Sequence, residues 1–295
     1  MGNIDSFLHY LDLNKGYSAN TVKSYQVDLT QFQEYLSENY PETDIQESTA
    51  PQVRSWIVNI MEYGVKPRSI RRKISSLQSF YNYLLNKGSI DLNPIEKLTV
   101  PKYTAKLPQY INTEDLKTLF DKIDFTDDFE GTRDRLILEM FYSTGIRLSE
   151  LVSVKHSDVD VGYGTIKVTG KGSKQRIIPL IPALINTLKV YLEKKHQYFP
   201  YGRNDYLIVT NKGKEPYAKF IYRVVYKYLS LATTLDKKSP HVLRHTFATH
   251  MLNNGAELNS IKEFLGHANL SATQVYTHNT VEKLKKIYKR AHPKA

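Results

Sequence analysis

The sequence predicts a mainly α-helical protein with a small antiparallel β-sheet, divided into two domains. Apolar residues recur at helical spacing along most of the 295 residues, and alternating strand patterns stand out only around a glycine-rich turn at residues 170–174. Residues 92–110 hold three prolines and little periodicity. We interpret them as a linker between a helical domain of residues 1–101 and a second domain of residues 102–295, in which helices accompany the small sheet.

The first domain has the pattern of four helices. Residues 3–14 carry apolar side chains at helical spacing, and Ser18 is suited to cap a second helix. The third helix follows Pro51, and the fourth starts near Pro67 and ends at Gly88, which is a common residue after a helix. The buried face of the fourth helix is predicted from a stripe comprising Ile70, Ile74, Leu77, Tyr81 and Leu84.

Basic side chains concentrate on this fourth helix. Residues 63–90 hold six basic residues and no acidic one, in a domain of 10 basic and 11 acidic residues. A charge run is often only a solvated face, but within a nearly neutral domain it favours a surface that faces phosphates. The candidate phosphate contacts of this domain are Arg68, Arg71, Arg72 and Lys73.

The second domain is strongly basic. It holds the other 31 basic and 19 acidic residues, a net charge of +12, which indicates a nucleic acid or an anionic membrane surface as partner. No run approaches the roughly 18 apolar residues of a membrane span, and the N-terminus lacks the pattern of a secretory signal. The absence of cysteine excludes disulfides and thiolate chemistry. We therefore expect a cytoplasmic protein with no membrane partner.

Residues 144–145 break the chain between two helices of this domain, and Arg147 falls at or just before the new helix. Free backbone N–H groups at such a position already favour an anion. The remaining pattern predicts helices at 113–123, 131–143, 183–195, 218–231 and from Ser239 onward, strands at 165–169 and 175–179, a short strand at 206–209, and an amphipathic tail helix at about 280–290.

The helix after Ser239 carries His241 and Arg244, which share a face because they are three residues apart. His241 and His245 have the spacing of a helical metal pair, but the glutamate of the zinc-protease motif is absent and an arginine beside the site repels a cation. No metal site is predicted. The glycine-rich turn around Lys171 does not fit a nucleotide-binding loop, because a strand follows it where that motif leads into a helix. Taken alone, the turn can also be interpreted as a plain basic hairpin.

Five short motifs occur in one order: residues 144–151 (TGIRLSEL), 170–172 (GKG), 241–245 (HVLRH), 265–267 (LGH) and 275–276 (VY). With these motifs the chain resembles the tyrosine recombinase (phage-integrase) family, and it is most similar to the Xer subgroup. The resemblance implies that residues 1–101 form a SAM-like core-binding domain. Residues 102–295 would then be the α+β catalytic domain, and the two would form a clamp on duplex DNA.

The resemblance also implies the chemistry. Tyr276 would attack a DNA phosphate to form a 3′-phosphotyrosyl link, and two rounds of exchange would pass through a Holliday junction. No cofactor is implied. Arg147 and Arg244 would hold the phosphate, because guanidinium groups pair with its non-bridging oxygens. Lys171 would protonate the leaving oxygen, His241 would accept the tyrosine proton or steady the phosphate, and His267 would donate to an oxygen. DNA contacts are expected at Arg68, Arg71, Arg72 and Lys73 of the first domain and at Lys174 and Arg176 of the second.

The expected function is site-specific recombination of the Xer type, which resolves chromosome dimers. The expected partners are a duplex DNA recombination site and a tetramer, of this chain alone or with a paralogous recombinase, on two such sites. The tail helix would dock on a neighbouring subunit, and an activating protein is a further possible partner. Three alternatives stay open: an integrase or transposase of a mobile element, a type IB topoisomerase-like enzyme, and a catalytically silent DNA-binding protein.

Overall fold

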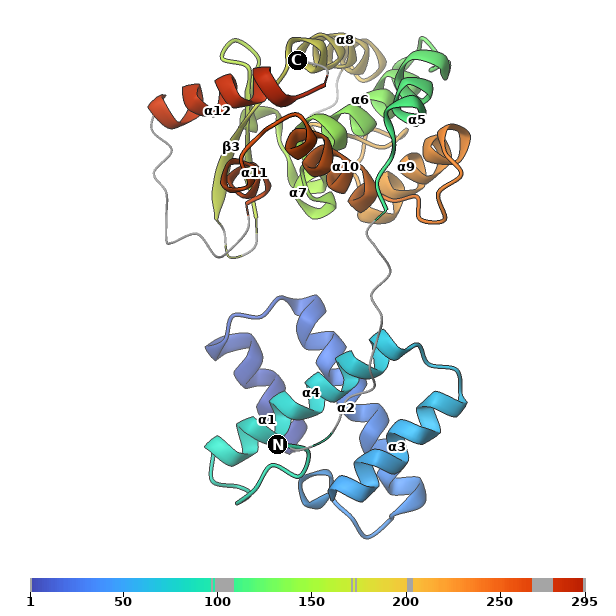
Figure 1. Cartoon of the computed structure of the whole chain (residues 1–295), viewed down its shortest axis with the longest axis vertical. Helices are drawn as coiled ribbons and strands as arrows, with labels where there is room; N and C mark the ends of the chain where they lie inside the picture. Colours follow the sequence, from blue (N-terminus) through green and yellow to red (C-terminus); the bar gives the residue numbers. More distant parts are fainter. Residues whose placement is uncertain are drawn as a thin grey trace. The chain divides into compact units, whose positions relative to one another are not determined.

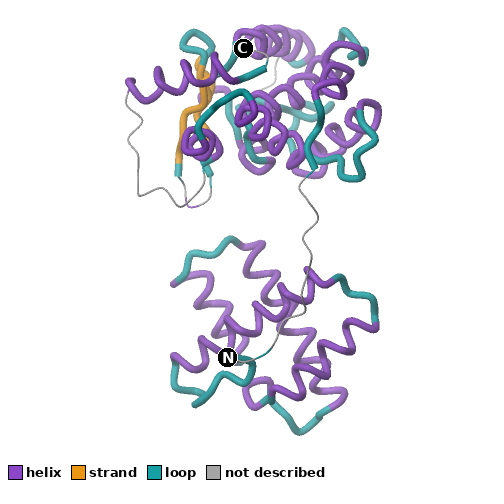
Figure 2. The backbone as a smooth tube through the Cα atoms, viewed as in Figure 1, coloured by secondary structure: helices purple, strands orange, loops and turns teal. Residues whose placement is uncertain are grey.

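A computed structural model describes residues 2–96, 98, 109–170, 172, 174–200, 204–266 and 278–293, with backbone only for residues 278–283. The chain divides into two compact units, residues 1–106 and 107–295, each drawn in Figures 1 and 2. None of the helices in the described ranges is both long enough and apolar enough to cross a membrane.

The N-terminal unit is built of the predicted helices (Figure 1). Ser18 caps the second of them, its hydroxyl accepting the Thr21 N–H at 3.3 Å. The predicted stripe from Ile70 to Leu84 is buried together with Trp56, and each such side chain removed from water stabilises the unit by about 1.5–3 kcal/mol. The elements are α1 (Asn3–His9), which continues into the π-helix η1 (Tyr10–Asn14), α2 (Ala19–Asn39), the 3-10 turn η2 (Ile45–Glu47), α3 (Ala50–Glu62) and α4 (Pro67–Asn86).

A buried ion cluster joins α2 to α4. Asp28 is fully buried and accepts hydrogen bonds from Arg72, from Lys73 Nζ at 3.2 Å and from Ser76 Oγ at 2.8 Å. Lys73 is 7% exposed and also donates to Gln31. A buried charge needs such partners. Lys73 therefore holds two helices together. The sequence predicted a surface contact between Lys73 and DNA, and the burial of Lys73 does not fit that prediction.

The other predicted contacts of α4 lie at the surface. Arg68 and Arg71 are exposed. Arg72 is also exposed, although one of its nitrogens reaches Asp28. The cluster at Asp28 therefore divides the four candidates into one buried lysine and three exposed arginines.

The C-terminal unit combines helices with a small sheet, which Figure 2 draws in orange. Helix α6 lies at the centre of this unit. It packs against α8, α9 and α10 and has buried residues on every side, as expected of a core helix. Its helices are α5 (Thr113–Lys117) with the π-helix η3 (Thr118–Lys122), α6 (Phe129–Thr144), α7 (Leu148–Ser153), the 3-10 turn η4 (His156–Asp158), α8 (Pro182–Tyr198), α9 (Ala218–Ala232), α10 (Pro240–Asn253), α11 (Leu258–Leu265) and α12 (His278–Ala291).

The sheet of the described residues has the antiparallel order β1-β2-β3, with β1 (Val159–Asp160), β2 (Thr165–Thr169) and β3 (Gln175–Pro179). Strands β2 and β3 are the predicted hairpin, in which Val168 lies opposite Arg176. Strand β1 escaped prediction because it is only two residues long. Residues 206–209 form no strand; they are buried or half-buried, and Tyr206 makes a single bridge to Lys155.

Helix α12 covers the predicted tail helix. Its residues Leu284, Tyr288 and Ala291 are buried in the core of their own unit, and the Tyr288 hydroxyl donates to the Ser143 carbonyl near the end of α6. The face that we expected to dock on a neighbouring subunit thus packs within the same chain in this structure.

Candidate active site

Two helices of the C-terminal unit end at glycines in the left-handed conformation. Gly145 ends α6 at φ 59°, and Gly266 ends α11 at φ 62°. A Cβ on Gly145 would lie 2.6 Å from the Phe247 ring, and one on Gly266 would lie 3.1 Å from the Arg176 side chain. Both positions thus need glycine for its backbone freedom and for its lack of a side chain.

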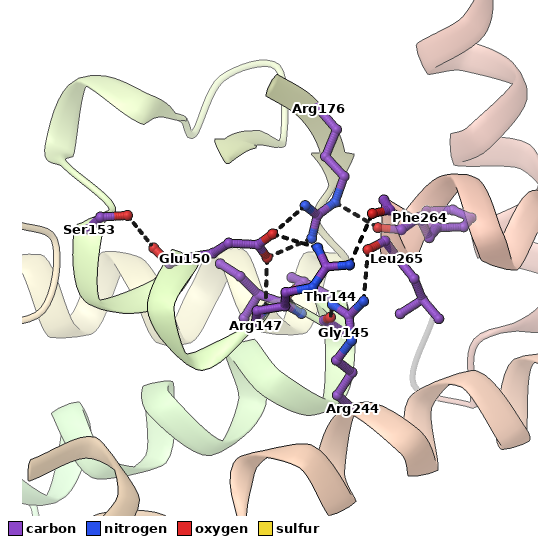
Figure 3. A network of polar contacts seen from close by, with 11 residues as sticks. Thr144, Gly145, Arg147, Glu150, Ser153, Arg176, Arg244, Phe264 and Leu265 are labelled. Carbon is purple, nitrogen blue, oxygen red and sulfur yellow. Dashed lines mark hydrogen bonds and ion pairs between the residues drawn. The ribbon is translucent and has the colours of Figure 1, made fainter. Parts of the chain in front are cut away.

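Three arginines donate to three successive carbonyls at the end of α11, as Figure 3 shows. Each of these arginines comes from a different segment of the unit. The C-terminus of a helix has unpaired carbonyls and the negative end of the helix dipole, so it stabilises cations. The bonds run from Arg176 Nε to the Phe264 oxygen (2.8 Å), from Arg244 Nη2 to the Leu265 oxygen (2.7 Å) and from Arg147 Nη2 to the Gly266 oxygen (2.9 Å).

Glu150 is the carboxylate within this group. Its two oxygens accept Arg176 Nη1 at 2.7 Å and Nη2 at 2.8 Å. They also accept the Arg147 backbone N–H and Nη1, both at 2.8 Å. Burial by itself would raise the pKa of Glu150, but hydrogen bonds and charge from Arg176, with the donors of Arg147, lower it to about 2. Glu150 is therefore ionised at neutral pH.

Arg244 completes the group from α10 and also donates to the Gly145 carbonyl. Burial, together with the charges of Arg147 and Arg176, lowers the pKa of Arg244 to about 9, so it keeps its charge at neutral pH. Among the described residues of this network, three guanidinium groups face one carboxylate. The surplus of positive charge makes this a place for an anion.

The exposure of the arginines differs. The Arg147 side chain is 33% exposed and Arg244 is half-buried, whereas Arg176 is 4% exposed. An anion from solvent can therefore meet Arg147 and Arg244. Arg176 was predicted from the sequence to contact DNA, and the structure instead buries it on Glu150 and Phe264.

The structure places the remaining predicted residues only in part. His241 is exposed in the first turn of α10, three residues before Arg244, and Lys174 is exposed just before β3. Lys171, His267 and Tyr276 lie outside the described residues. The described ranges contain no cluster of three or more metal-ligating side chains.

Glu150 is the residue that the sequence reasoning missed. Its signal was present, because an acidic residue three positions after the first residue of a helix turn commonly accepts that residue's backbone N–H. Arg147 and Glu150 have this spacing.

Comparison with known proteins matches each unit to one family. Residues 4–88 match the phage integrase N-terminal SAM-like domain, and residues 109–283 match the phage integrase family. The chain is 38% identical over 320 residues to tyrosine recombinase XerC of Chlorobaculum tepidum, covering 99% of this chain and 94% of that protein. It is 38% identical over 295 residues to tyrosine recombinase XerD of Listeria innocua, covering 99% of each.

A solved structure agrees with these matches. The XerH site-specific recombinase bound to difH substrate, in a pre-cleavage complex, is 26% identical to this chain with a TM-score of 0.68. The match covers 92% of this chain and 79% of that one.

The chain belongs to the phage integrase family, the tyrosine recombinases. Within it, the chain is an Xer-like site-specific recombinase, an enzyme that cleaves and rejoins DNA. The predicted resemblance and the predicted fold class are confirmed.

Proposed function

We propose that Arg147 and Arg244 hold the phosphate at which this enzyme cuts duplex DNA. The observation that carries this proposal is the cluster itself: two guanidinium groups that solvent can reach, each fixed by backbone carbonyls, in a site with surplus positive charge. Negative charge builds on the non-bridging oxygens of a phosphate under attack, and donors that are already oriented stabilise it.

Tyr276 supplies the nucleophile in this proposal. Its hydroxyl oxygen bonds to phosphorus, and the bond from phosphorus to the 5′-oxygen breaks. Lys171 gives a proton to that leaving oxygen. His241 takes the tyrosine proton or steadies the phosphate, and His267 donates to a non-bridging oxygen. The 5′-hydroxyl of a second duplex reverses the step, so the energy of the phosphodiester is conserved.

Two such rounds join two duplexes through a Holliday junction, with four copies of the chain, or of the chain and a paralogue, on two DNA sites. Arg68, Arg71, Arg72 and Lys174 are exposed cations that would contact the DNA backbone. Resolution of chromosome dimers is the Xer-type role that we favour, because the likeness to XerC and XerD extends over the full length of the chain.

The test uses the DNA that the protein itself selects. Tyr276→Phe protein is mixed with fragmented genomic DNA, and the bound sequence is recovered and rebuilt as a nicked suicide duplex. Wild-type protein should form a covalent adduct on that duplex, and Tyr276→Phe should bind it without forming one. An adduct in Tyr276→Phe would remove Tyr276 as nucleophile.

The recovered DNA and the adduct assay, together with a plasmid-relaxation assay, separate the alternatives. A single chromosomal site supports dimer resolution, whereas the ends of a mobile element would favour an integrase or transposase. Relaxation of supercoiled plasmid without site preference would favour a type IB topoisomerase-like activity. Binding without any adduct by the wild type would leave a catalytically silent DNA-binding protein.

A further inference from the structure

We infer that Arg176 is a positioning residue of the DNA-cleavage reaction, which acts through Glu150 on Arg147 and through Phe264 on the end of α11. The inference rests on the phosphate-holding role proposed for Arg147 and Arg244. It replaces the direct DNA contact that the sequence alone predicted for Arg176.

The contacts of Arg176 leave little of it for DNA. The residue is 4% exposed, and three of its nitrogens donate at 2.7–2.8 Å to Glu150 and to the Phe264 carbonyl. Its side chain also passes so close to Gly266 that a Cβ there would lie 3.1 Å from Arg176 Cδ. The Arg176 side chain thus extends from β3 to Glu150 and to the turn that ends α11 (Figure 3).

Arg176 joins three segments that are distant in sequence. It belongs to β3, it holds Glu150 of α7, and it holds the carbonyl that precedes the acceptor of Arg244. In the sequence, β3 begins four residues after Lys171, the proposed general acid. This one side chain therefore ties β3 to α7, which begins next to Arg147, and to the end of α11, whose carbonyls hold Arg147 and Arg244.

Removing Arg176 would change the charge and the freedom of the site. Glu150 is 2% exposed, and Arg147 would then be its remaining ion-pair partner within the described part of the chain. A buried carboxylate with one partner draws that partner inward. Arg147 would be turned from the solvent side toward Glu150, and the surplus positive charge of the network would fall by one.

Arginine is required here for its shape as well as its charge. A planar guanidinium can serve both oxygens of Glu150 with Nη1 and Nη2 while its Nε serves a carbonyl on the other edge. The ammonium group of a lysine is a point charge and cannot meet these three acceptors at once. Charge alone, as in Arg176→Lys, should therefore fail to restore the reaction.

The experiment compares Arg176→Met and Arg176→Lys with the wild type on the nicked suicide duplex, below the melting temperature of each variant. We expect the single-turnover rate of adduct formation at saturating DNA to fall at least tenfold in both, with DNA affinity and its salt dependence unchanged within about twofold. Arg176→Ala should regain several-fold activity in millimolar guanidinium, and sodium chloride at equal ionic strength should have no such effect.

Two controls separate positioning from other roles. Lys174→Met tests an exposed cation of the same hairpin and should weaken binding and its salt dependence. Arg133→Met removes another buried arginine, 2% exposed and paired with Asp134 away from the site. It should lower the melting temperature while leaving the rate of adduct formation of the folded enzyme unchanged.

A double-mutant cycle tests the route through Glu150. If Arg176 acts through that carboxylate, Arg176→Met with Glu150→Gln should be no slower than the slower single variant. Independent, multiplying losses would overturn the route, and a loss of affinity that follows salt would restore the direct DNA contact. Unchanged cleavage in the Arg176 variants, or variants that do not fold at any temperature, would reduce Arg176 to a core residue.

The proposed function and this inference can fail separately. If the wild type forms no adduct, the proposed function fails. If the wild type forms one, Arg147→Ala forms none, and the Arg176 variants match the wild type, only the inference fails.

Discussion

Arg147 donates to the carbonyl oxygen of Gly266, 119 positions later in the chain, at 2.9 Å. The bond joins the start of α7 to the end of α11, and Arg147 also binds Glu150 within its own helix turn. A guanidinium held from two sides has lost most of its freedom before any DNA arrives. A catalytic group oriented in advance costs no reorganisation when the reaction occurs.

Arg147→Lys should therefore keep most DNA affinity and lose cleavage. A lysine cannot meet the Gly266 carbonyl, Glu150 and a phosphate together. We expect the rate of adduct formation to fall about 100-fold, the size of loss seen when an oriented donor to a developing oxyanion is removed. Single-turnover cleavage and a binding titration measure the two effects, and an equal loss in both would contradict the prediction.

Gly145→Ala should destabilise the C-terminal unit by roughly 2–4 kcal/mol, because it combines a left-handed backbone with a Cβ 2.6 Å from the Phe247 ring. Urea unfolding measures the loss. Gly255→Ala is the matched control: φ there is 84°, but no atom lies within 4 Å of its Cβ. It should cost about 1 kcal/mol through the backbone alone, and equal losses would refute the predicted clash.

Glu150 should make the free energy of unfolding depend on pH in the acid range. Its pKa is about 2 in the folded protein against an ordinary 4.5, so the unfolded chain takes up the proton more readily. The stabilisation is fully present above about pH 5 and is lost as the pH falls toward 2, with a full size of roughly 3 kcal/mol. Chemical unfolding across pH 2–7 checks this, and Glu150→Gln should flatten the part of the curve that belongs to this residue.

Lys73 and Arg68 should behave differently although both lie on α4. Lys73→Met removes a partner of the buried Asp28 and should lower stability by roughly 1–3 kcal/mol without changing the salt dependence of DNA binding. Arg68→Ala removes an exposed cation and should lower the salt slope by about 1 without changing stability. Binding titrations at several salt concentrations and thermal unfolding measure the two effects. A lower salt slope for Lys73→Met together with a lower stability for Arg68→Ala would contradict the prediction.

Lys171→Ala should fail to cleave ordinary DNA, since the leaving 5′-oxygen would lack its proton donor. The loss should be recovered on DNA with sulfur at the bridging 5′ position, because a thiolate leaves without a proton. Arg147→Ala is the control and should stay inactive on both substrates. No recovery by Lys171→Ala would remove the lysine as general acid.

Much of the fold could be predicted because the periodicity of its helices is strong and their ends carry glycine, proline and serine signals. Lys73 and Arg176, which were predicted to contact DNA and are buried in the structure, show where the sequence alone falls short. In α4, Lys73 follows Ile70 by three residues and precedes Leu77 by four, so it shares their buried face. In β3, Arg176 is two residues from Ile178, which points the same way into the core.

The pattern alone could thus have placed both cations inside. It could not name their partners, because Asp28 and Glu150 come from other elements and meet the cations only after the chain has folded. The motifs did indicate the site, because residues close in sequence meet without help from the rest of the fold. Short spacing places His241 beside Arg244 within a single helix turn. The carbonyls at the end of α11 have no such signal.

The acceptors of all three arginines at the end of α11 are main-chain atoms. Every amino acid supplies the same main-chain carbonyl. The positions of these acceptors therefore depend on the backbone conformation and not on the identity of the side chains. A substitution scan over residues 264–266 would register apolar packing at Phe264 and Leu265 and crowding at Gly266. The scan would not test the carbonyl oxygens that accept from the guanidinium groups, because every substituted residue keeps its carbonyl. Only a chemical change to the peptide bond itself would test them.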